Sequence, residues 1–545
     1  MKNRFRTHLF VALCIASSTA AWSANPPKLQ VKIESGIVEG TSFGSNGSGA
    51  AFLGIPYAAP PIGNSRWTPP RSVQPWKGVR PAKTLGPSCP QQPERYPRYW
   101  KAVVTAIGGD PSAVPPLGPT SEDCLSLNIW TSNLGGKTKQ PVLVWIHGAG
   151  FKASRGGDEA AVLAKEGAVV VTVNYRLGIL GFLAHPALTK ESPHNSSGNY
   201  GLLDQIEALR WVQRNIAAFS GDPNRVTIFG NSAGAVSVLY LLSSPLAQGL
   251  FHGAIVESTG GTFPLMNLSA AESAGQQAMK DLIPAEGDPT AAMRAASVDT
   301  LLARQATQFV GRPIEDGWVV SNLGKERSRQ VPMIIGANQD EDKIALLLAP
   351  QEIPQTREAY RKLVEEVGTP FAEQLLAMNP VSSDEPVQAA ALRYTTDRDY
   401  VCASRYIAGK RAGPTWLYFL SVATAATPGG DRLGAFHGAD MRLLFNLDFG
   451  VPEGPPARHV GELMRHYWIQ FAATGDPNTK GLPEWPRYQG AKPKYLFLGD
   501  PIRTVSDGNT GTCGILDLLW DNTSNNETKQ PTSFVEAVAV RNNSK

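Results

Sequence analysis

The sequence predicts an α/β fold in which a large, mostly parallel sheet is covered by helices on both faces. Short apolar runs bounded by turn residues recur along the chain, at residues 142–146, 169–173, 226–229, 254–256, 333–335 and 416–420. Such runs are typical of strands buried in a parallel sheet. Stretches with helical spacing lie between them, for example at 206–216, where the Gly-Asp-Pro sequence at 221–223 is expected to end the pattern. Alternation of strand and helix over several hundred residues favours a doubly wound sheet.

Length and composition are those of a globular protein with a large core. The chain has 545 residues, of which 42% are hydrophobic and 18% charged, so it is too apolar to be disordered. Its net charge is only +4 and no block of Lys or Arg stands out, which gives no support for nucleic acid as a partner. We expect one domain, residues 24–545, in which the Pro- and Gly-rich segments 87–120 and 450–456 form structured loops.

The first 23 residues have the features of a secretory signal peptide. Basic residues precede an apolar stretch that begins at about Leu9. Cleavage after Ser23 puts Ala21 and Ser23 at the two small-residue positions, whereas cleavage after Ala24 is less regular. The alternative is an N-terminal membrane anchor, but the apolar stretch is shorter than the ~20 residues needed to span a bilayer. We therefore expect a secreted or periplasmic protein without stable membrane insertion.

Four cysteines remain after the leader is removed: Cys89, Cys124, Cys402 and Cys513. In an oxidising compartment they are expected to form two disulfides, and their spacing does not choose among the three possible pairings. No two of them have the close spacing of zinc ligands. No metal and no cofactor are expected.

The sequence GNSAG at 230–234 predicts a nucleophile turn. It follows the expected strand at 225–229 and precedes a stretch compatible with a helix. A strand-to-helix turn this tight needs small residues beside the serine, because larger side chains would meet the sheet or the helix. As text alone the motif is weak in a chain with 53 glycines. Its position between strand and helix is what favours Ser232 as a nucleophile.

A serine nucleophile needs a base within hydrogen-bond reach and a third group that orients the base. Of eight histidines, His437 is the best candidate, because the small residues of its GAFHGAD loop suit delivery of an imidazole to a crowded centre. Taken alone, a histidine in such a position is more often a loop or surface residue than a catalytic one. Serine hydrolases of this α/β type present the acid between serine and histidine in the chain. Asp340, Glu341 and Asp342 follow an expected strand there, and spacing does not separate them from one another or from a solvated acidic turn.

A glycine-rich turn, HGAGF at 147–151, follows the strand expected at 142–146. Successive backbone N–H groups in such a turn can stabilise a developing oxyanion, and Ala233 would add another donor. The alternative is a purely structural glycine turn.

These ordered motifs resemble the type-B carboxylesterase and cholinesterase family of the α/β-hydrolase superfamily, over nearly the whole mature chain. Besides the serine turn, the matching segments are GIPYA at 54–58, GNSRW at 63–67, EDCLSLN at 122–128, NYR at 174–176 and GDP at 221–223. The resemblance implies an α/β-hydrolase fold with loop insertions over the active site. It also implies a small-molecule carboxylic ester as the substrate.

The resemblance assigns residues as well. It implies Glu341 as the acid beside Ser232 and His437, and an oxyanion hole made by Ala149, Gly150 and Ala233. It further implies disulfides Cys89–Cys124 and Cys402–Cys513, and a buried ion pair between Arg66 and Glu122.

The sequence departs from the family pattern at three positions. Asn231 replaces a glutamate, and Ala149 and Asp342 replace glycines. Ala149 keeps its backbone donor provided that its φ stays allowed, and its methyl group narrows the acyl site. Loss of the glutamate at Asn231 removes a charge near the triad and alters the pH optimum.

The expected reaction is ester hydrolysis through an acyl-enzyme, with activity falling near pH 6 to 7 if the pKa of His437 is ordinary. The alternatives are a non-catalytic binding or adhesion protein of this fold, and an amide, carbamate or polyester hydrolase with the same triad. The aromatic and basic stretch 95–101 is either a solvated loop or, if it overhangs the site, a selector of aromatic or anionic esters. The sequence does not indicate the natural ester or the oligomeric state.

Overall fold

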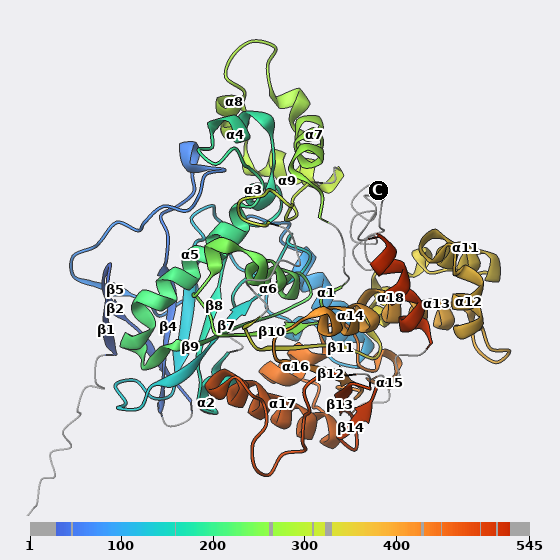
Figure 1. Cartoon of the computed structure of the whole chain (residues 1–545). Coiled ribbons are helices and arrows are strands. Elements are labelled where there is room, and N and C mark those ends of the chain that lie inside the picture. Colours follow the sequence, from blue (N-terminus) through green and yellow to red (C-terminus); the bar gives the residue numbers. More distant parts are fainter. Residues whose placement is uncertain are drawn as a thin grey trace, which may run out of the picture.

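An 11-stranded sheet runs through the protein (Figure 1). The computed structural model describes residues 29–44, 47–157, 160–260, 265–307, 310–321, 330–426, 430–447, 449–490, 492–507 and 511–523. The predicted signal peptide, residues 1–23, lies outside these ranges. Within the sheet, the seven neighbouring strands β8-β7-β9-β10-β11-β12-β13 are parallel. The remaining strands pair antiparallel, β14 at one edge and β6, β4 and β3 at the other. The predicted large, mostly parallel sheet is confirmed.

The strands of the large sheet are β3 (Thr41–Phe43), β4 (Gly49–Pro56), β6 (Ser126–Thr131), β7 (Gln140–Ile146), β8 (Val169–Val173), β9 (Gly221–Asn231), β10 (Gly253–Glu257), β11 (Met333–Asn338), β12 (Thr415–Leu420), β13 (Lys494–Leu498) and β14 (Arg503–Ser506). A small sheet near the N-terminus contains β1 (Gln30–Ile33), β2 (Gly36–Glu39) and β5 (Val79–Pro81).

The helices are α1 (Arg95–Ala106), α2 (Ala161–Lys165), α3 (Gly178–Phe182), α4 (Pro186–Glu191), α5 (Tyr200–Asn215), α6 (Ala233–Ser243), α7 (Leu268–Met279), α8 (Pro289–Ala295), α9 (Val298–Thr307), α10 (Ala345–Leu348), α11 (Arg357–Gly368), α12 (Ala372–Met378), α13 (Val387–Thr396), α14 (Cys402–Lys410), α15 (Gly430–Leu433), α16 (Ala439–Phe445), α17 (Pro455–Thr474) and α18 (Thr512–Thr523). Within the described residues, none of them combines the length and the apolar character needed to cross a membrane.

Both faces of the sheet are buried, and each face has its own core. Alternate residues of β7 divide between the two cores: Val142, Val144 and Ile146 pack with residues of α5 and α6, whereas Leu143 and Trp145 pack with residues of α16 and α17. Side chains of a strand point alternately to opposite faces, so a strand buried on both sides is apolar throughout. This is why the central strands appear in the sequence as continuous apolar runs.

All six predicted apolar runs lie in strands, and the helical stretch 206–216 lies almost entirely in α5. The Gly-Asp-Pro segment 221–223, however, is not the turn that ends this helix. The helix ends at Asn215, and Ser220 makes the turn with a φ of 67°. Gly221 already pairs with Gln140 as the first residue of β9.

The expectation that residues 87–120 form loops throughout is wrong, because they contain the 12-residue helix α1. Its buried side chains include Trp100, Val103 and Val104, which have the spacing of an apolar helix face and pack in the core beside α16 and α17. The proline within the helix, Pro97, lies in the first turn, where a missing N–H costs little.

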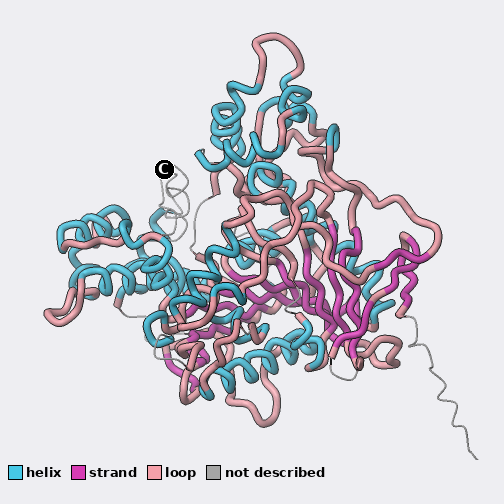
Figure 2. Tube along the Cα trace, turned by 180° about the vertical axis from the view of Figure 1, so that it is seen from behind, coloured by secondary structure: helices cyan, strands magenta, loops and turns pink. Residues whose placement is uncertain are grey.

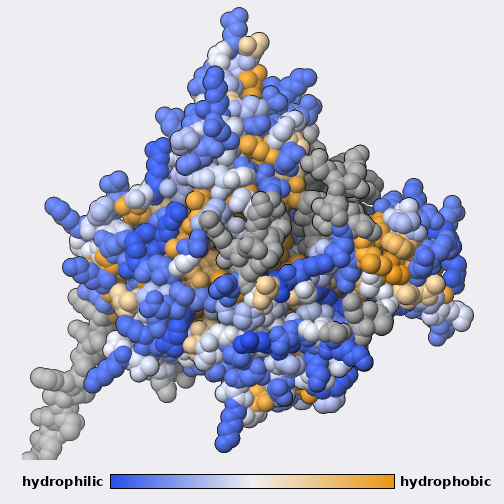
Figure 3. Space-filling model, in the orientation of Figure 1, coloured by the Kyte–Doolittle hydropathy of each residue, from blue (hydrophilic) through white to orange (hydrophobic). Residues whose placement is uncertain are grey.

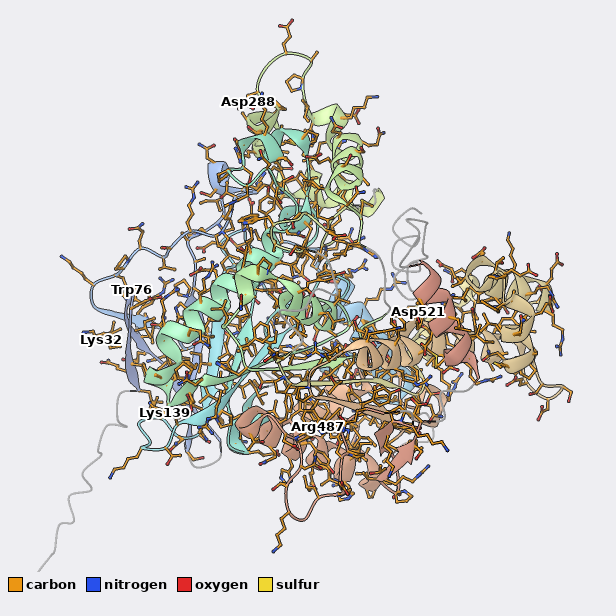
Figure 4. The ribbon with its side chains drawn as sticks, in the orientation of Figure 1. Lys32, Trp76, Lys139, Asp288, Arg487 and Asp521 are labelled. Carbon is orange, nitrogen blue, oxygen red and sulfur yellow. A yellow bond between two sulfur atoms is a disulfide. The ribbon has the colours of Figure 1, made fainter. Side chains whose placement is uncertain are left out.

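Two helical lobes project from the sheet. Figure 1 shows α3, α4, α7, α8 and α9 in an upper lobe, and α11, α12, α13 and α18 in a lateral lobe; Figure 2 shows both from behind. In Figure 4, Asp288 lies near the tip of the upper lobe and Asp521 near the lateral one. The face of the molecule seen in Figure 3 is largely hydrophilic, with apolar areas on both lobes.

The structure contains two disulfides, Cys89–Cys124 and Cys402–Cys513, the pairing that the family resemblance implies. The first closes the segment that contains α1. The second joins α14 to α18 and thereby ties the lateral lobe to the sheet.

Arg66 and Glu122 form the expected ion pair at the base of the upper lobe. Nε and Nη2 of Arg66 donate to the two carboxylate oxygens at 2.7 and 2.5 Å. Nη1 donates to the carbonyl groups of Arg294 and Ala296 at 3.0 and 2.7 Å. The side chains are only 8% and 15% exposed.

We expect Glu122→Ala to lower the free energy of unfolding by about 3 kcal/mol, because the guanidinium of Arg66 would stay buried without its counter-charge. Urea unfolding followed by fluorescence measures this loss. The control is Glu373→Ala, which removes the partner of Arg361 in a pair whose side chains are 75% and 48% exposed, and should cost less than about 1 kcal/mol. Equal losses in the two variants would contradict a buried role for Glu122.

Candidate active site

Ser232 lies in the turn between β9 and α6, immediately after the strand. Its backbone has a φ of 59° and a ψ of −126°, a conformation that non-glycine residues rarely adopt. The surroundings hold it there: the N–H of Ser232 donates to the carbonyl of Glu257 at 2.9 Å, and its own carbonyl accepts from Val236 at 3.0 Å. The hydroxyl is thereby presented at the carboxyl end of the sheet, where ligands of open α/β sheets bind.

Glycines around Ser232 let two backbone segments meet. A Cβ on Gly234 would lie 2.1 Å from the carbonyl oxygen of Ile146, and a Cβ on Gly230 would lie 2.6 Å from the same atom. A Cβ on Gly148 would lie 2.4 Å from the carbonyl oxygen of Asn231. These are backbone contacts that cannot move aside cheaply, so the glycines keep the end of β7 against the serine turn.

The turn after β7 brings the predicted oxyanion donors to the serine. The position of a Cβ on Gly148 is 3.1 Å from the Cβ of Ser232 and 3.4 Å from the N of Ala233. The N–H groups of Ala149 and Gly150 have no hydrogen-bond partner among the described residues. Ala233 is the first residue of α6, where an N–H has no partner within its own helix.

Alanine can replace glycine without strain only where the backbone has an ordinary, negative φ. Ala149 does not have such a conformation. Its φ is 62°, and Gly150 and Phe151 follow with φ values of 66° and 61°. This left-handed region costs a residue with a Cβ roughly 1–2 kcal/mol. The alanine therefore keeps the donor geometry of the turn at a cost in stability.

Glu341 and His437 lie within hydrogen-bond distance of each other at the ends of distant segments. Glu341 follows β11, in the 3₁₀ turn Glu341–Ile344, and is fully buried; His437 is 7% exposed. Oε2 of Glu341 lies 2.6 Å from Nδ1 of His437, while Oε1 accepts from the N–H of Asn338 at 2.7 Å. Both carboxylate oxygens are thus fixed, and Nε2 is the ring nitrogen that remains for another partner.

The structure separates the three acids that spacing left equivalent. Of the three, only Glu341 is hydrogen-bonded to the side chain of His437. Asp340 instead ties the two loops together: its N–H donates to the carbonyl of Ala435 at 2.9 Å, and its Oδ2 accepts from the N–H of Ala435 at 3.0 Å. The carboxyl of Asp342 is buried away from solvent, and its backbone N–H donates to the hydroxyl of Thr396 at 3.1 Å.

A further acid, Asp440, joins the serine turn to the histidine loop. The amide of Asn231 donates to both carboxylate oxygens of Asp440 at 3.1 Å. The hydroxyl groups of Ser258 and Tyr418 are 3.4 and 3.5 Å from Oδ2. The residue that departs from the family pattern at 231 thus binds a carboxylate that lies three residues after His437.

Two tyrosines lie against His437. The hydroxyl of Tyr99, which is in α1, donates to the backbone carbonyl of His437. The ring of Tyr400, which is outside α1, lies 5.2 Å from the imidazole, centroid to centroid. The stretch 95–101 is therefore not a solvated loop. It is a helix packed against the histidine loop.

Burial opposes protonation of His437, but the surrounding carboxylates outweigh it and raise its pKa above the ordinary value. Glu341 makes the largest contribution, followed by Asp440 and Asp342. Burial also raises the pKa of Asp440 to about 6 and that of Asp342 to about 7. The surroundings of His437 therefore stabilise its imidazolium form relative to a histidine in water.

Sequence reasoning missed the roles of Asp440, Tyr99 and Asn338. Asp440 lies in the GAFHGAD loop, and Tyr99 lies in the aromatic and basic stretch 95–101. No contact could be predicted for either residue from the sequence. Asn338 ends β11 and donates through Nδ2 to the carbonyl of Phe436 at 3.0 Å. Among the described residues, no group of three or more His, Cys, Asp or Glu side chains is placed to hold a metal ion.

Known proteins resemble this chain over most of its length. Residues 27–513 match the model of the carboxylesterase family. Fumonisin B1 esterase from Sphingopyxis macrogoltabida is 37% identical over 493 residues, covering 86% of each chain. Cocaine esterase from Oryctolagus cuniculus is 33% identical over 499 residues, covering 85% of this chain and 89% of its own. The solved structure of a PNB esterase superposes with a TM-score of 0.73 at 28% identity, covering 90% of this chain and all of its own.

We expect Ala149→Gly to raise the free energy of unfolding by about 1 kcal/mol, because glycine adopts a φ of 62° without the Cβ penalty. Urea unfolding of the two proteins measures the change. Ala153→Gly is the control: this neighbour is fully buried and does not have a positive φ, so its replacement should destabilise. A loss of stability in both variants would contradict strain at Ala149.

Proposed function

The chain belongs to the carboxylesterase family and is a carboxylic ester hydrolase, and we propose that it works through a triad of Ser232, His437 and Glu341. The observation that carries this proposal is the 2.6 Å contact between Oε2 of Glu341 and Nδ1 of His437. The histidine loop is linked to the serine turn through Asp440, which accepts from the amide of Asn231. A carboxylate on Nδ1 fixes the tautomer whose Nε2 accepts a proton.

The proposed reaction has two acyl-transfer steps. The hydroxyl oxygen of Ser232 attacks the ester carbonyl while Nε2 of His437 takes its proton, and the same proton then goes to the departing alkoxide. Water attacks the resulting acyl-enzyme, with His437 again taking and returning the proton. The N–H groups of Ala149, Gly150 and Ala233 stabilise the oxyanion in both steps. Glu341 orients the imidazole and stabilises its charged form.

The proposed location of the enzyme is outside the cytoplasm, after cleavage of the leader near Ser23. The two disulfides support this, because such bonds persist in oxidising compartments. The natural substrate is proposed as a small-molecule ester. Hydrolysis of amides, carbamates or polyesters would use the same residues. Only an activity assay distinguishes these reactions from ester hydrolysis.

We expect Ser232→Ala to lower kcat on p-nitrophenyl butyrate at least about 10³-fold, because the nucleophile is lost while the oxyanion donors remain. Glu341→Gln should lower it about 10²-fold or more, because an amide does not stabilise the imidazolium.

Asp342→Asn is the matched control for the acid, since it changes the next residue of the same buried turn without touching the Glu341 contact. It should keep kcat within about tenfold. A Glu341→Gln enzyme as active as Asp342→Asn would reject Glu341 as the triad acid. Full activity of Ser232→Ala would reject the serine mechanism.

The raised pKa of His437 predicts the pH profile. The base must be neutral to accept a proton, so activity falls as pH drops through its pKa, and a raised pKa moves this fall above pH 6.5. We expect the acid limb of kcat/KM to have its midpoint above that value. Asp440→Asn, which removes a neighbouring charge, should move the midpoint downward. A profile that stays flat to pH 4 would exclude His437 as the base.

A further inference from the structure

A groove separate from the serine turn lies where α1, α10 and α15 meet. It encloses about 840 Å³, a size typical of small-molecule sites. Its wall consists of one face of α1, from Glu94 to Ala106, with Leu346 and Leu347 of α10 and Arg432 and Leu433 of α15. Ser232, His437 and the oxyanion turn do not line it.

Half of the lining of the groove is apolar. Leu346, Leu347 and Leu433 contribute to it, together with the small side chains of Ala102 and Ala106. Leu346 is 41% exposed, which makes it one of the few large apolar side chains that face solvent among the described residues. A mostly apolar lining with a few polar groups is typical of ligand pockets.

The lining of the groove also carries a net positive charge. Arg98, Lys101 and Arg432 belong to it, against the single carboxylate of Glu94. Glu94 lies 3.9 Å from Lys101 and its side chain is 82% exposed. Arg98 and Arg432 form no ion pair with any described residue, so their guanidinium groups are available to a ligand.

We propose that this groove binds a medium- or long-chain carboxylate. The alkyl chain packs on the leucine side chains, and the carboxylate pairs with the guanidinium groups of Arg98 and Arg432. Arginine suits this role because its planar fork matches the two oxygens of a carboxylate. A single negative charge on a long apolar tail matches this lining better than phosphate or a polyanion, which would leave the leucine side chains uncovered.

The position of the groove gives such a ligand a connection to the triad. Helix α1 carries Tyr99, which donates to the carbonyl of His437. Helix α10 follows the turn of Glu341 directly, and α15 ends four residues before His437. A molecule in the groove contacts all three segments. Long-chain carboxylates are also the acids that hydrolysis of fatty esters releases, although the proposal does not depend on the serine mechanism.

The test is isothermal titration calorimetry of the full-length Ser232→Ala protein with decanoate at pH 8 and low ionic strength. We expect saturable binding, weakened by added salt. Acetate, which lacks the chain, and decyl maltoside below its micelle concentration, which lacks the charge, should each bind at least about tenfold more weakly, since each keeps only half of the interactions. Because this protein lacks the nucleophile, the outcome is independent of whether Ser232 is catalytic.

Groove variants made in the same Ser232→Ala background decide where decanoate binds. Arg98→Gln with Arg432→Gln should weaken binding about tenfold or more, and so should Leu346→Asn. Arg71→Gln is the matched control, an exposed arginine outside the groove, and should change nothing. The proposal is overturned if folded protein does not bind decanoate, if decyl maltoside binds equally well, or if the groove variants retain the parent affinity, which would place decanoate elsewhere.

Discussion

The contact between the end of β7 and the serine turn is the constraint on which the candidate site depends. Here two backbones approach so closely that Gly148, Gly230 and Gly234 have no room for a side chain. The approach brings the turn that carries Ala149 and Gly150 beside Ser232. It also requires the unusual backbone of Ser232, which the carbonyl of Glu257 in the next strand holds in place. Parallel pairing of β7, β9 and β10 therefore determines where Ser232 and the proposed oxyanion donors meet.

A second set of contacts joins the loop of Glu341 to the loop of His437. These contacts are mainly electrostatic. Asp340 and Asn338 hold the loops together through backbone groups, which leaves the carboxylate of Glu341 free to bind the imidazole. The carboxylates around His437 favour its charged form, the form that the proposed acyl transfer would generate. Asn231 removes a charge relative to the family pattern, yet its amide binds Asp440, so a carboxylate remains beside the serine turn.

The parts of the fold that follow a simple pattern were predictable from sequence. The central strands are apolar on both faces, and the serine turn has a strand before it and a helix after it. Residues 340–342 were not separable in the same way, because all three are acids. The hydrogen bonds between Asp340 and Ala435, which join the two loops, position Glu341 toward His437. Helix α1 was missed because its segment is rich in Pro and Gly, although its buried side chains have helical spacing. The φ of Ala149 is set by its neighbours in space and leaves no mark on the sequence.

Each of the two disulfides closes a covalent ring, and each ring contains one of the two residues joined by the hydrogen bond between Tyr99 and His437. The ring closed by Cys89 and Cys124 contains Tyr99, and the ring closed by Cys402 and Cys513 contains His437 itself. The hydrogen bond between these residues thus joins two segments that are each cross-linked independently. In heterologous production, the reducing cytoplasm of a host would therefore yield a chain without either disulfide. Neither partner of this hydrogen bond would then lie in a cross-linked segment. Export to the periplasm, or a strain that oxidises thiols, is the suitable route for preparing the protein.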